Sequence, residues 1–77
     1  MKIKQAIKFK GLNINDIFKL PCVKSIEKGE SGKPYAILYP STTEGRLIAE
    51  VEDVIVELQN EQWQVFGAEA YGRLEQW

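Results

Sequence analysis

Apolar and polar positions alternate along the first residues of the chain. Ile3, Ile7 and Phe9 occupy one side of the pattern, and lysines fill most positions on the other side. A period of two residues is typical of a half-buried β-strand. The pattern therefore predicts a strand over residues 3–9, weakened where Gln5 falls on the apolar side.

The spacing then changes to one typical of a helix. Asn13 is a favourable N-cap residue, and an acidic residue follows it three positions later, as in a capping box. Ile14, Ile17 and Phe18 recur at i, i+3 and i+4, so they are predicted to share one helical face. Pro21 cannot continue a helix. We expect a short helix from Ile14 to the residue before Pro21.

The middle of the chain is rich in β-branched and apolar runs separated by polar, glycine-containing segments. Such runs predict strands, and the segments between them predict turns. The expected central strand is 35–39, and a hairpin turn is expected at 43–45. The other predicted strands are 22–28, 47–51, 54–58 and 63–65.

The last ten residues, 68–77, predict a helix. Tyr71, Leu74 and Trp77 approximately share one face, whereas Gly72 weakens the helix by up to ~1 kcal/mol relative to alanine. Packing on the sheet must then stabilise it. The element order β-α-β-β-β-β-β-α predicts one α+β domain over residues 1–77, with a small, curled, mainly antiparallel sheet.

Composition narrows the classes of function. The net charge is −1, so no basic excess points to binding of a nucleic-acid polymer. A single cysteine cannot form an internal disulfide, and no apolar run approaches the ~20 residues of a membrane span. We expect a cytoplasmic protein with no membrane partner. Because a 77-residue core supplies little net stability, a homo-oligomer is also expected.

The chain has no histidine. A Ser-His or Cys-His nucleophile pair is therefore impossible, and so is a zinc site of histidine and cysteine ligands. Carboxylates, lysines, two arginines and aromatic residues remain, and these suit binding better than catalysis. The sequence predicts a protein that is not an enzyme, with no cofactor, catalytic residue or metal site.

Two segments resemble a known family. The first is residues 5–13 followed by Asp16-Ile17, and the second runs from Glu44-Gly45 through 53–56 and 61–63 to Glu69, Tyr71 and Leu74. Together they resemble a widespread family of small tailed-phage and prophage proteins, whose members read A-x-Q/K-F-x-G-x-N-x-x-E/D-I near the start and G-D-x-I later. The resemblance implies a phage origin and a fold. The family has no general assigned activity, so no catalytic residue is transferred.

The chain departs from the family pattern at three places. The usual glycine before the aspartate is Glu52, and the usual lysine-glycine turn is Asn60-Glu61. A usual cysteine-containing loop after the aromatic strand is replaced by residues 65–68.

Aromatic residues crowd the second half of the chain. Aromatic rings can stack on flat ligands or pack on a second subunit, and arginines can bind phosphate bidentately. The alternative is that most of the rings form ordinary core, with the terminal tryptophan covering an edge. The candidate ligand-binding residues are Tyr39, Arg46, Trp63, Phe66, Tyr71, Arg73 and Trp77.

Three other features of the sequence are candidate sites. Glu50, Glu52 and Asp53 could hold a metal if they converged, but a solvated strand face shared by Glu50 and Glu52 is the preferred interpretation. The loop 29–33 has the glycines, serine and lysine of an anion-binding turn but not the spacing of a P-loop, so a flexible hairpin loop is preferred. Cys22 is expected to be a buried structural thiol, although a neighbouring lysine could lower its pKa.

Four hypotheses follow. The first is a phage counter-defence protein that sequesters a nucleotide-type immune signal in an oligomer, since 77 residues rarely enclose a ~300 Å³ pocket alone. The second is an inhibitor or adaptor of a host protein, docked on the edge of the strand at 35–39 or on the terminal helix. The third is a structural accessory protein. A carboxylate-metal phosphodiesterase ranks last.

Overall fold

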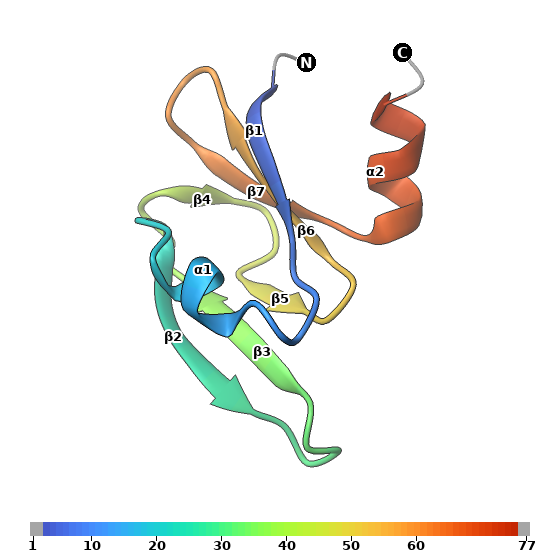
Figure 1. Ribbon diagram of the computed structural model, residues 1–77. Helices are drawn as coiled ribbons and strands as arrows, with labels where there is room; N and C mark the ends of the chain where they lie inside the picture. Colours follow the sequence, from blue (N-terminus) through green and yellow to red (C-terminus); the bar gives the residue numbers. More distant parts are fainter. Residues whose placement is uncertain (1–2, 76–77) are drawn as a thin grey trace.

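The computed structural model describes residues 3–75, with the side chains of residues 3–73. Its strands form a four-stranded sheet in the order β1-β6-β7-β4 and a three-stranded sheet in the order β2-β3-β5 (Figure 1). All strand pairs are antiparallel except β4 with β7. The predicted α+β class with a mainly antiparallel sheet is confirmed. The elements are β1 (Ile3–Lys8), α1 (Ile14–Phe18), β2 (Val23–Lys28), β3 (Pro34–Leu38), β4 (Thr43–Glu44), β5 (Ile48–Glu50), β6 (Val54–Leu58), β7 (Trp63–Phe66) and α2 (Ala68–Glu75).

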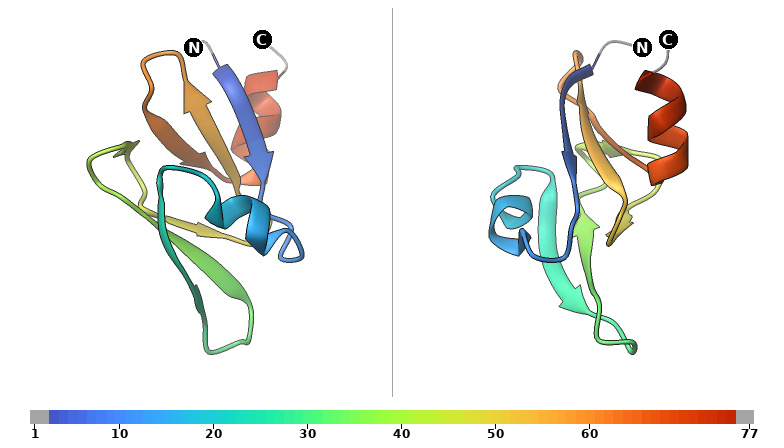
Figure 2. Two further views of the ribbon diagram at one scale, coloured as in Figure 1. Left: turned by 60° about the vertical axis from the view of Figure 1, so that its left-hand side comes forward. Right: turned by 45° about the vertical axis from the view of Figure 1, so that its right-hand side comes forward.

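The two sheets and α2 form three layers. The main core lies between the sheets and includes Phe9, Ile17, Leu38, Ile55 and Trp63. A smaller core of residues from β6 lies on the other side of the four-stranded sheet, where Tyr71 of α2 packs against it. Figure 2 shows α1 and α2 on opposite sides of the molecule.

Strand β6 explains why one run of the sequence is almost wholly apolar. Ile55 faces the main core, whereas Val54, Val56 and Leu58 face the smaller core. A strand buried on both faces loses the alternation of a half-exposed strand. Its pairing with β1 and β7 places β6 inside its sheet.

The first strand differs from the simple alternation that its sequence predicts. The β1–β6 register shifts between Ile3 and Gln5. Ile3 consequently packs in the smaller core, whereas Ile7 and Phe9 pack in the main core. The prediction that these three residues share one face is wrong, because the irregularity reverses the side of the sheet to which Ile3 points.

Strand β4 is a second difference. Thr43 and Glu44 were predicted as part of a hairpin turn, but they pair with Trp63 and Gln64 of β7. The pairing is parallel and joins residues far apart in sequence, which local turn chemistry cannot indicate. Gly45 follows with a φ of 78°, so a turn does lie directly after this short strand.

The central position predicted for residues 35–39 is confirmed, because β3 pairs with both β2 and β5. The hypothesis that docks a partner on the edge of this strand is therefore wrong. Both rows of backbone groups are occupied by neighbouring strands, so no strand can be added there.

Candidate functional site

Helix α1 is a single turn whose two sides have different environments. Asn13 stands at the N-cap, but its side chain makes no cap hydrogen bond. Its Oδ1 instead accepts the amide of Lys10 at 2.9 Å, and its Nδ2 donates to the carbonyl of Lys8 at 2.9 Å. The predicted capping interaction is wrong. The side chain fixes the chain between β1 and the helix instead.

Only one apolar residue of α1 is buried. Ile17 is fully buried in the main core. Ile14 is 38% exposed, Phe18 is 58% exposed, and Leu12 just before the helix is 97% exposed. The predicted common face of Ile14, Ile17 and Phe18 is not buried as a unit, because only Ile17 packs in the main core, whereas Ile14 and Phe18 remain partly in solvent.

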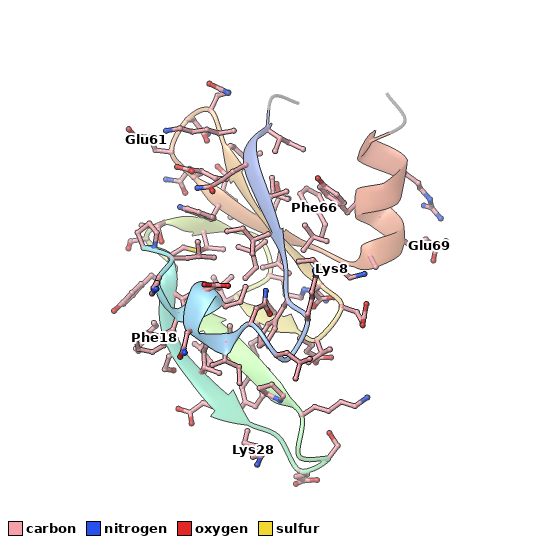
Figure 3. All side chains as sticks on the ribbon, viewed as in Figure 1. Lys8, Phe18, Lys28, Glu61, Phe66 and Glu69 are labelled. Atoms are coloured by element: carbon pink, nitrogen blue, oxygen red, sulfur yellow. The ribbon has the colours of Figure 1, made fainter. Side chains whose placement is uncertain are left out.

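Ile14 and Phe18 line a groove of about 560 Å³ between α1, β2 and the loop that joins β2 to β3. Ile26 and Pro34 contribute apolar surface from the sheet. Figure 3 shows Phe18 on α1 and Lys28 at the far end of β2. We call this surface the α1 groove. Its lining is Gly11, Ile14, Asn15, Phe18, Ile26, Glu27, Lys28, Gly32 and Pro34.

Unpaired lysines outnumber the acidic residues at the α1 groove, where Glu27 is a lining residue and Asp16 is adjacent in sequence to the lining residue Asn15. Lys28 lines it, and Lys10, Lys19 and Lys33 are each adjacent in sequence to a lining residue. All four are exposed, and none forms an ion pair with a residue that the structure describes. By contrast, every described ion pair involves a residue of the four-stranded sheet, of α2 or of the loops on either side of β5.

Positive and negative charges are concentrated in different halves of the sequence. Residues 1–33 contain eight lysines and three acidic residues, a net charge of +5. Residues 34–77 contain two arginines and eight acidic residues, a net charge of −6. The overall charge of −1 therefore conceals a basic first half that supplies α1 and β2.

The candidate ligand-binding residues do not gather at one place. Trp63 is 3% exposed and belongs to the main core. Phe66 and Tyr71 are brought together in the smaller core, where Figure 3 shows Phe66 between the sheet and α2. Tyr39 is 41% exposed at the end of β3. Trp77 lies outside the described residues.

The two arginines are also separate and paired. The guanidinium of Arg46 lies 3.1 Å from Asp53 Oδ2, at the turn between β5 and β6. The guanidinium of Arg73 donates to Glu69 Oε1 at 2.8 Å along α2. In the described part of the chain, the predicted aromatic and arginine set forms no common pocket.

The carboxylates near β5 stabilise local structure. Glu52 Oε2 lies 3.0 Å from Lys8 Nζ, and Asp53 Oδ2 accepts the amide of Glu50 at 2.9 Å. No group of three potential metal ligands occurs among the described residues. Glu50 and Glu52 are both exposed, but they do not share a strand face, since β5 ends at Glu50 and Glu52 lies in the turn.

The glycine-containing loop 29–33 borders a second cavity, of about 320 Å³. Ser31, Lys33 and Tyr35 line it from one side, and Glu50 and Glu52 line it from the other. The amide of Gly29 donates to the Lys33 carbonyl and that of Gly32 to the Gly29 carbonyl, each at 2.9 Å. These two amides close the hairpin loop and are not free to bind an anion.

Cys22 is fully buried in the main core, as expected for a structural thiol. Its pKa is raised from 9.0 to about 12, first by burial and to a smaller extent by the negative charge of Glu57, while a backbone hydrogen bond acts in the opposite direction. The expected effect of a nearby lysine is absent from these causes. A neutral, inaccessible thiol is a poor nucleophile.

The face of the three-stranded sheet that points away from the main core carries a strip of apolar side chains. Ile37 pairs with Ile48 across β3 and β5, and the alternation of β3 puts Tyr35 and Tyr39 on the same face. Tyr35 pairs with Glu27 on one side and Glu50 on the other. We call this surface the outer strip. It consists of Tyr35, Ile37, Tyr39 and Ile48, flanked by Glu27 and Glu50.

Sequence reasoning missed the α1 groove, although a signal for it is present. Leu12, Ile14, Ile17, Phe18 and Leu20 give five large apolar residues to one turn of helix and its flanks. That number exceeds what a single turn can bury on one side.

No helix in residues 3–75 is long and apolar enough to cross a membrane. Comparison with known proteins found no matching family model, curated protein or solved structure.

Proposed function

We propose that this chain is a protein-binding module that holds an acidic, amphipathic segment of a partner protein in the α1 groove. The observation that carries the proposal is the exposure of Ile14 and Phe18 in the lining of an open groove, with the exposed Leu12 next in sequence to the lining residue Gly11. Contiguous apolar surface with a polar rim is typical of interaction sites. Full burial of an exposed side chain of this size contributes ~1.5–3 kcal/mol, and burial of the exposed parts of Ile14 and Phe18 in a complex contributes a fraction of that.

The charges around the groove favour an acidic occupant. Lys10, Lys19, Lys28 and Lys33 have no ion-pair partner among the described residues, so each is available to a carboxylate. Opposite charges at the rim of an interface raise association rates and select partners. An amphipathic segment would place its apolar residues between α1 and β2 and its Asp and Glu residues against the lysines.

The proposed setting is a phage accessory protein that acts on a host protein, as an inhibitor or adaptor, in the host cytoplasm. It rests on the resemblance to small tailed-phage and prophage proteins. Glu52 and Glu61 stand at two positions where the family pattern has glycine. Their φ angles are 82° and 66°, so the backbone at both positions agrees with the pattern although the residue does not. Left-handed backbone is the conformation for which glycine is the usual residue.

A peptide-display selection tests the binding. Random peptides are selected on the native protein and counted again on Phe18→Ser, Lys28→Glu and the control Lys4→Ser. Phe18 and Lys28 are exposed, so both groove variants are expected to fold. Lys4 is also exposed but lies in β1 of the other sheet.

We expect enriched peptides with apolar residues at helical or alternating spacing together with Asp and Glu. Their affinity should fall at least tenfold on Phe18→Ser, fall on Lys28→Glu in a salt-dependent manner, and stay unchanged on Lys4→Ser. Peptides that bind Phe18→Ser as well as the native protein, or a selection that enriches no peptide, would overturn the proposal.

One observation favours a second candidate function, sequestration of a nucleotide-type immune signal. The 320 Å³ cavity beside loop 29–33 combines the aromatic ring of Tyr35 with the ammonium of Lys33 and the hydroxyl of Ser31. These groups suit a base and a phosphate, while Glu50 and Glu52 suit sugar hydroxyls. Thermal-shift measurements with mono- and cyclic nucleotides test it. We expect a nucleotide to raise the melting temperature of the native protein but not that of Lys33→Ala. No rise in the native protein, or the same rise in both proteins, would eliminate this candidate.

A further inference from the structure

The outer strip is an unpartnered sheet face. It is apolar and acidic, which are the properties proposed for the segment that occupies the α1 groove. Ile48 is 44% exposed and Tyr39 is 41% exposed. Within the described residues, no helix packs on this face, since α1 contacts β2 from the core side and α2 covers the other sheet. The strip is apolar along its middle and acidic at its sides.

The two surfaces are complementary in charge. The sides of the outer strip carry the carboxylates of Glu27 and Glu50, neither of which forms an ion pair with a described residue. The rim of the α1 groove carries the ammonium groups of Lys28 and its neighbours. Glu27 also lines the α1 groove and Lys33 lines the cavity beside Tyr35 and Glu50, so the complementarity rests on the lysine excess at the groove and on Glu50 at the strip.

We propose that the α1 groove of one copy is covered by the outer strip of a second copy. This inference rests on the proposed function, because it names what occupies the groove before a partner arrives. Both surfaces cannot meet within one molecule, since they lie on opposite faces of the three-stranded sheet. The contact is therefore between copies.

Because the two surfaces lie on opposite faces of the sheet, two copies cannot make both contacts with each other at once, so the contact is heterologous. Each copy keeps one free groove at one end and one free strip at the other, so association extends to longer assemblies unless the rotation closes a ring. The consequence is regulation of the binding site. Self-association hides the α1 groove, and an acidic partner segment must displace the outer strip to enter it.

Complementary variants test this arrangement without knowledge of the partner. Phe18→Ser disables the groove and leaves the strip, whereas Ile48→Ser disables the strip and leaves the groove. Leu12→Ser and Tyr39→Ser repeat the test at other exposed positions, and circular dichroism establishes that each variant is folded. The measurement is sedimentation velocity over a wide range of concentration.

The native protein should show an average mass that rises with concentration and falls as salt is added, because screening weakens contacts between exposed charges. Each variant alone should be monomeric. An equimolar mixture of Phe18→Ser and Ile48→Ser should form a dimer and nothing larger, since only one intact groove and one intact strip can meet.

Two results would overturn the inference. One is a native protein that stays monomeric at every concentration. The other is self-association of Ile48→Ser together with a monomeric Phe18→Ser, which would mean that two grooves meet symmetrically.

These failures are distinguishable from failure of the proposed function. If the protein is monomeric but still binds acidic peptides through Phe18, the proposed function stands and the proposed self-association is refuted. If the mixture of Phe18→Ser and Ile48→Ser forms the expected dimer but the protein binds no peptide, the proposed self-association stands and the proposed function is refuted.

Discussion

Glu50 and Asp53 are joined by two hydrogen bonds that close the turn between β5 and β6. The Asp53 carboxylate accepts the Glu50 amide at 2.9 Å, and the Asp53 amide donates to the Glu50 carbonyl at 3.0 Å. The side chain of Asp53 is only 14% exposed and also meets Arg46. An aspartate that appeared in the sequence as a possible metal ligand thus holds a turn.

Removal of the Asp53 side chain should destabilise the protein. Asp53→Ala leaves the Glu50 amide without its acceptor and Arg46 without its partner, and hydrogen bonds to charged groups contribute about 1.5–3 kcal/mol. Chemical denaturation should show a lower midpoint with an unchanged slope. Asp53→Asn keeps an acceptor oxygen and should lose less, and an equal loss in the two variants would contradict this account.

Glycine at position 52 should stabilise the protein. Glu52 has a φ of 82°, and a non-glycine residue in left-handed backbone costs roughly 1–2 kcal/mol. Glu52→Gly removes this strain but also loses the exposed ion pair with Lys8, which contributes little. We expect a gain of about 1 kcal/mol in the free energy of unfolding. The control Glu52→Ala loses the ion pair and keeps the strain, so it should give no gain.

Thr43→Val should also stabilise the protein. Thr43 is 6% exposed, and its hydroxyl has no hydrogen-bond partner in the described structure. Replacement of the hydroxyl by a methyl group of similar size removes a buried polar group and should raise the free energy of unfolding by about 1 kcal/mol. Thermal denaturation measures the gain. Thr42→Val removes a hydroxyl that bonds to the Tyr39 carbonyl, so that control should not stabilise.

The Cys22 thiol should make stability fall at alkaline pH. Burial raises its pKa from 9.0 to about 12 in the folded protein, whereas the unfolded chain releases the proton near the ordinary pKa. Between these values the unfolded state binds fewer protons, so stability decreases as pH rises, by up to about 1.4 kcal/mol per pH unit. The contribution is constant below pH 9.

The measurement is the difference in unfolding free energy between the native protein and Cys22→Ala across this range. Lysine deprotonation affects both proteins and cancels in the difference. A difference that stays constant from pH 8 to 11 would show that the thiol does not contribute.

Most of the local structure could be predicted from the sequence. The alternation in β1, the β-branched run of β6 and the glycine and proline positions between strands predict the type of every element except β4, with bounds within two residues of those observed. Elements with a strong pattern depend on nearest neighbours along the chain. The irregularity between Ile3 and Gln5 and the parallel pairing of Thr43 with Trp63 depend on distant partners, so local pattern could not reveal them.

The candidate site was less predictable. Residue types indicated Trp63 and Arg46 as ligand contacts, but burial of Trp63 and the pairing of Arg46 with Asp53 are properties of the folded chain. The exposure of Phe18 is also a property of the folded chain, because the helical spacing of Ile14, Ile17 and Phe18 does not indicate which of these side chains will pack against a sheet.

The sequence by itself determined the α+β class, the absence of histidine chemistry and the separation of positive and negative charge between the two halves of the chain. Only the tertiary structure decided where those charges lie and which apolar groups remain in solvent. The physical reason is that burial depends on what packs against an element. One turn of helix on the edge strand β2 had room to bury Ile17 and left Phe18 exposed beside unpaired lysines.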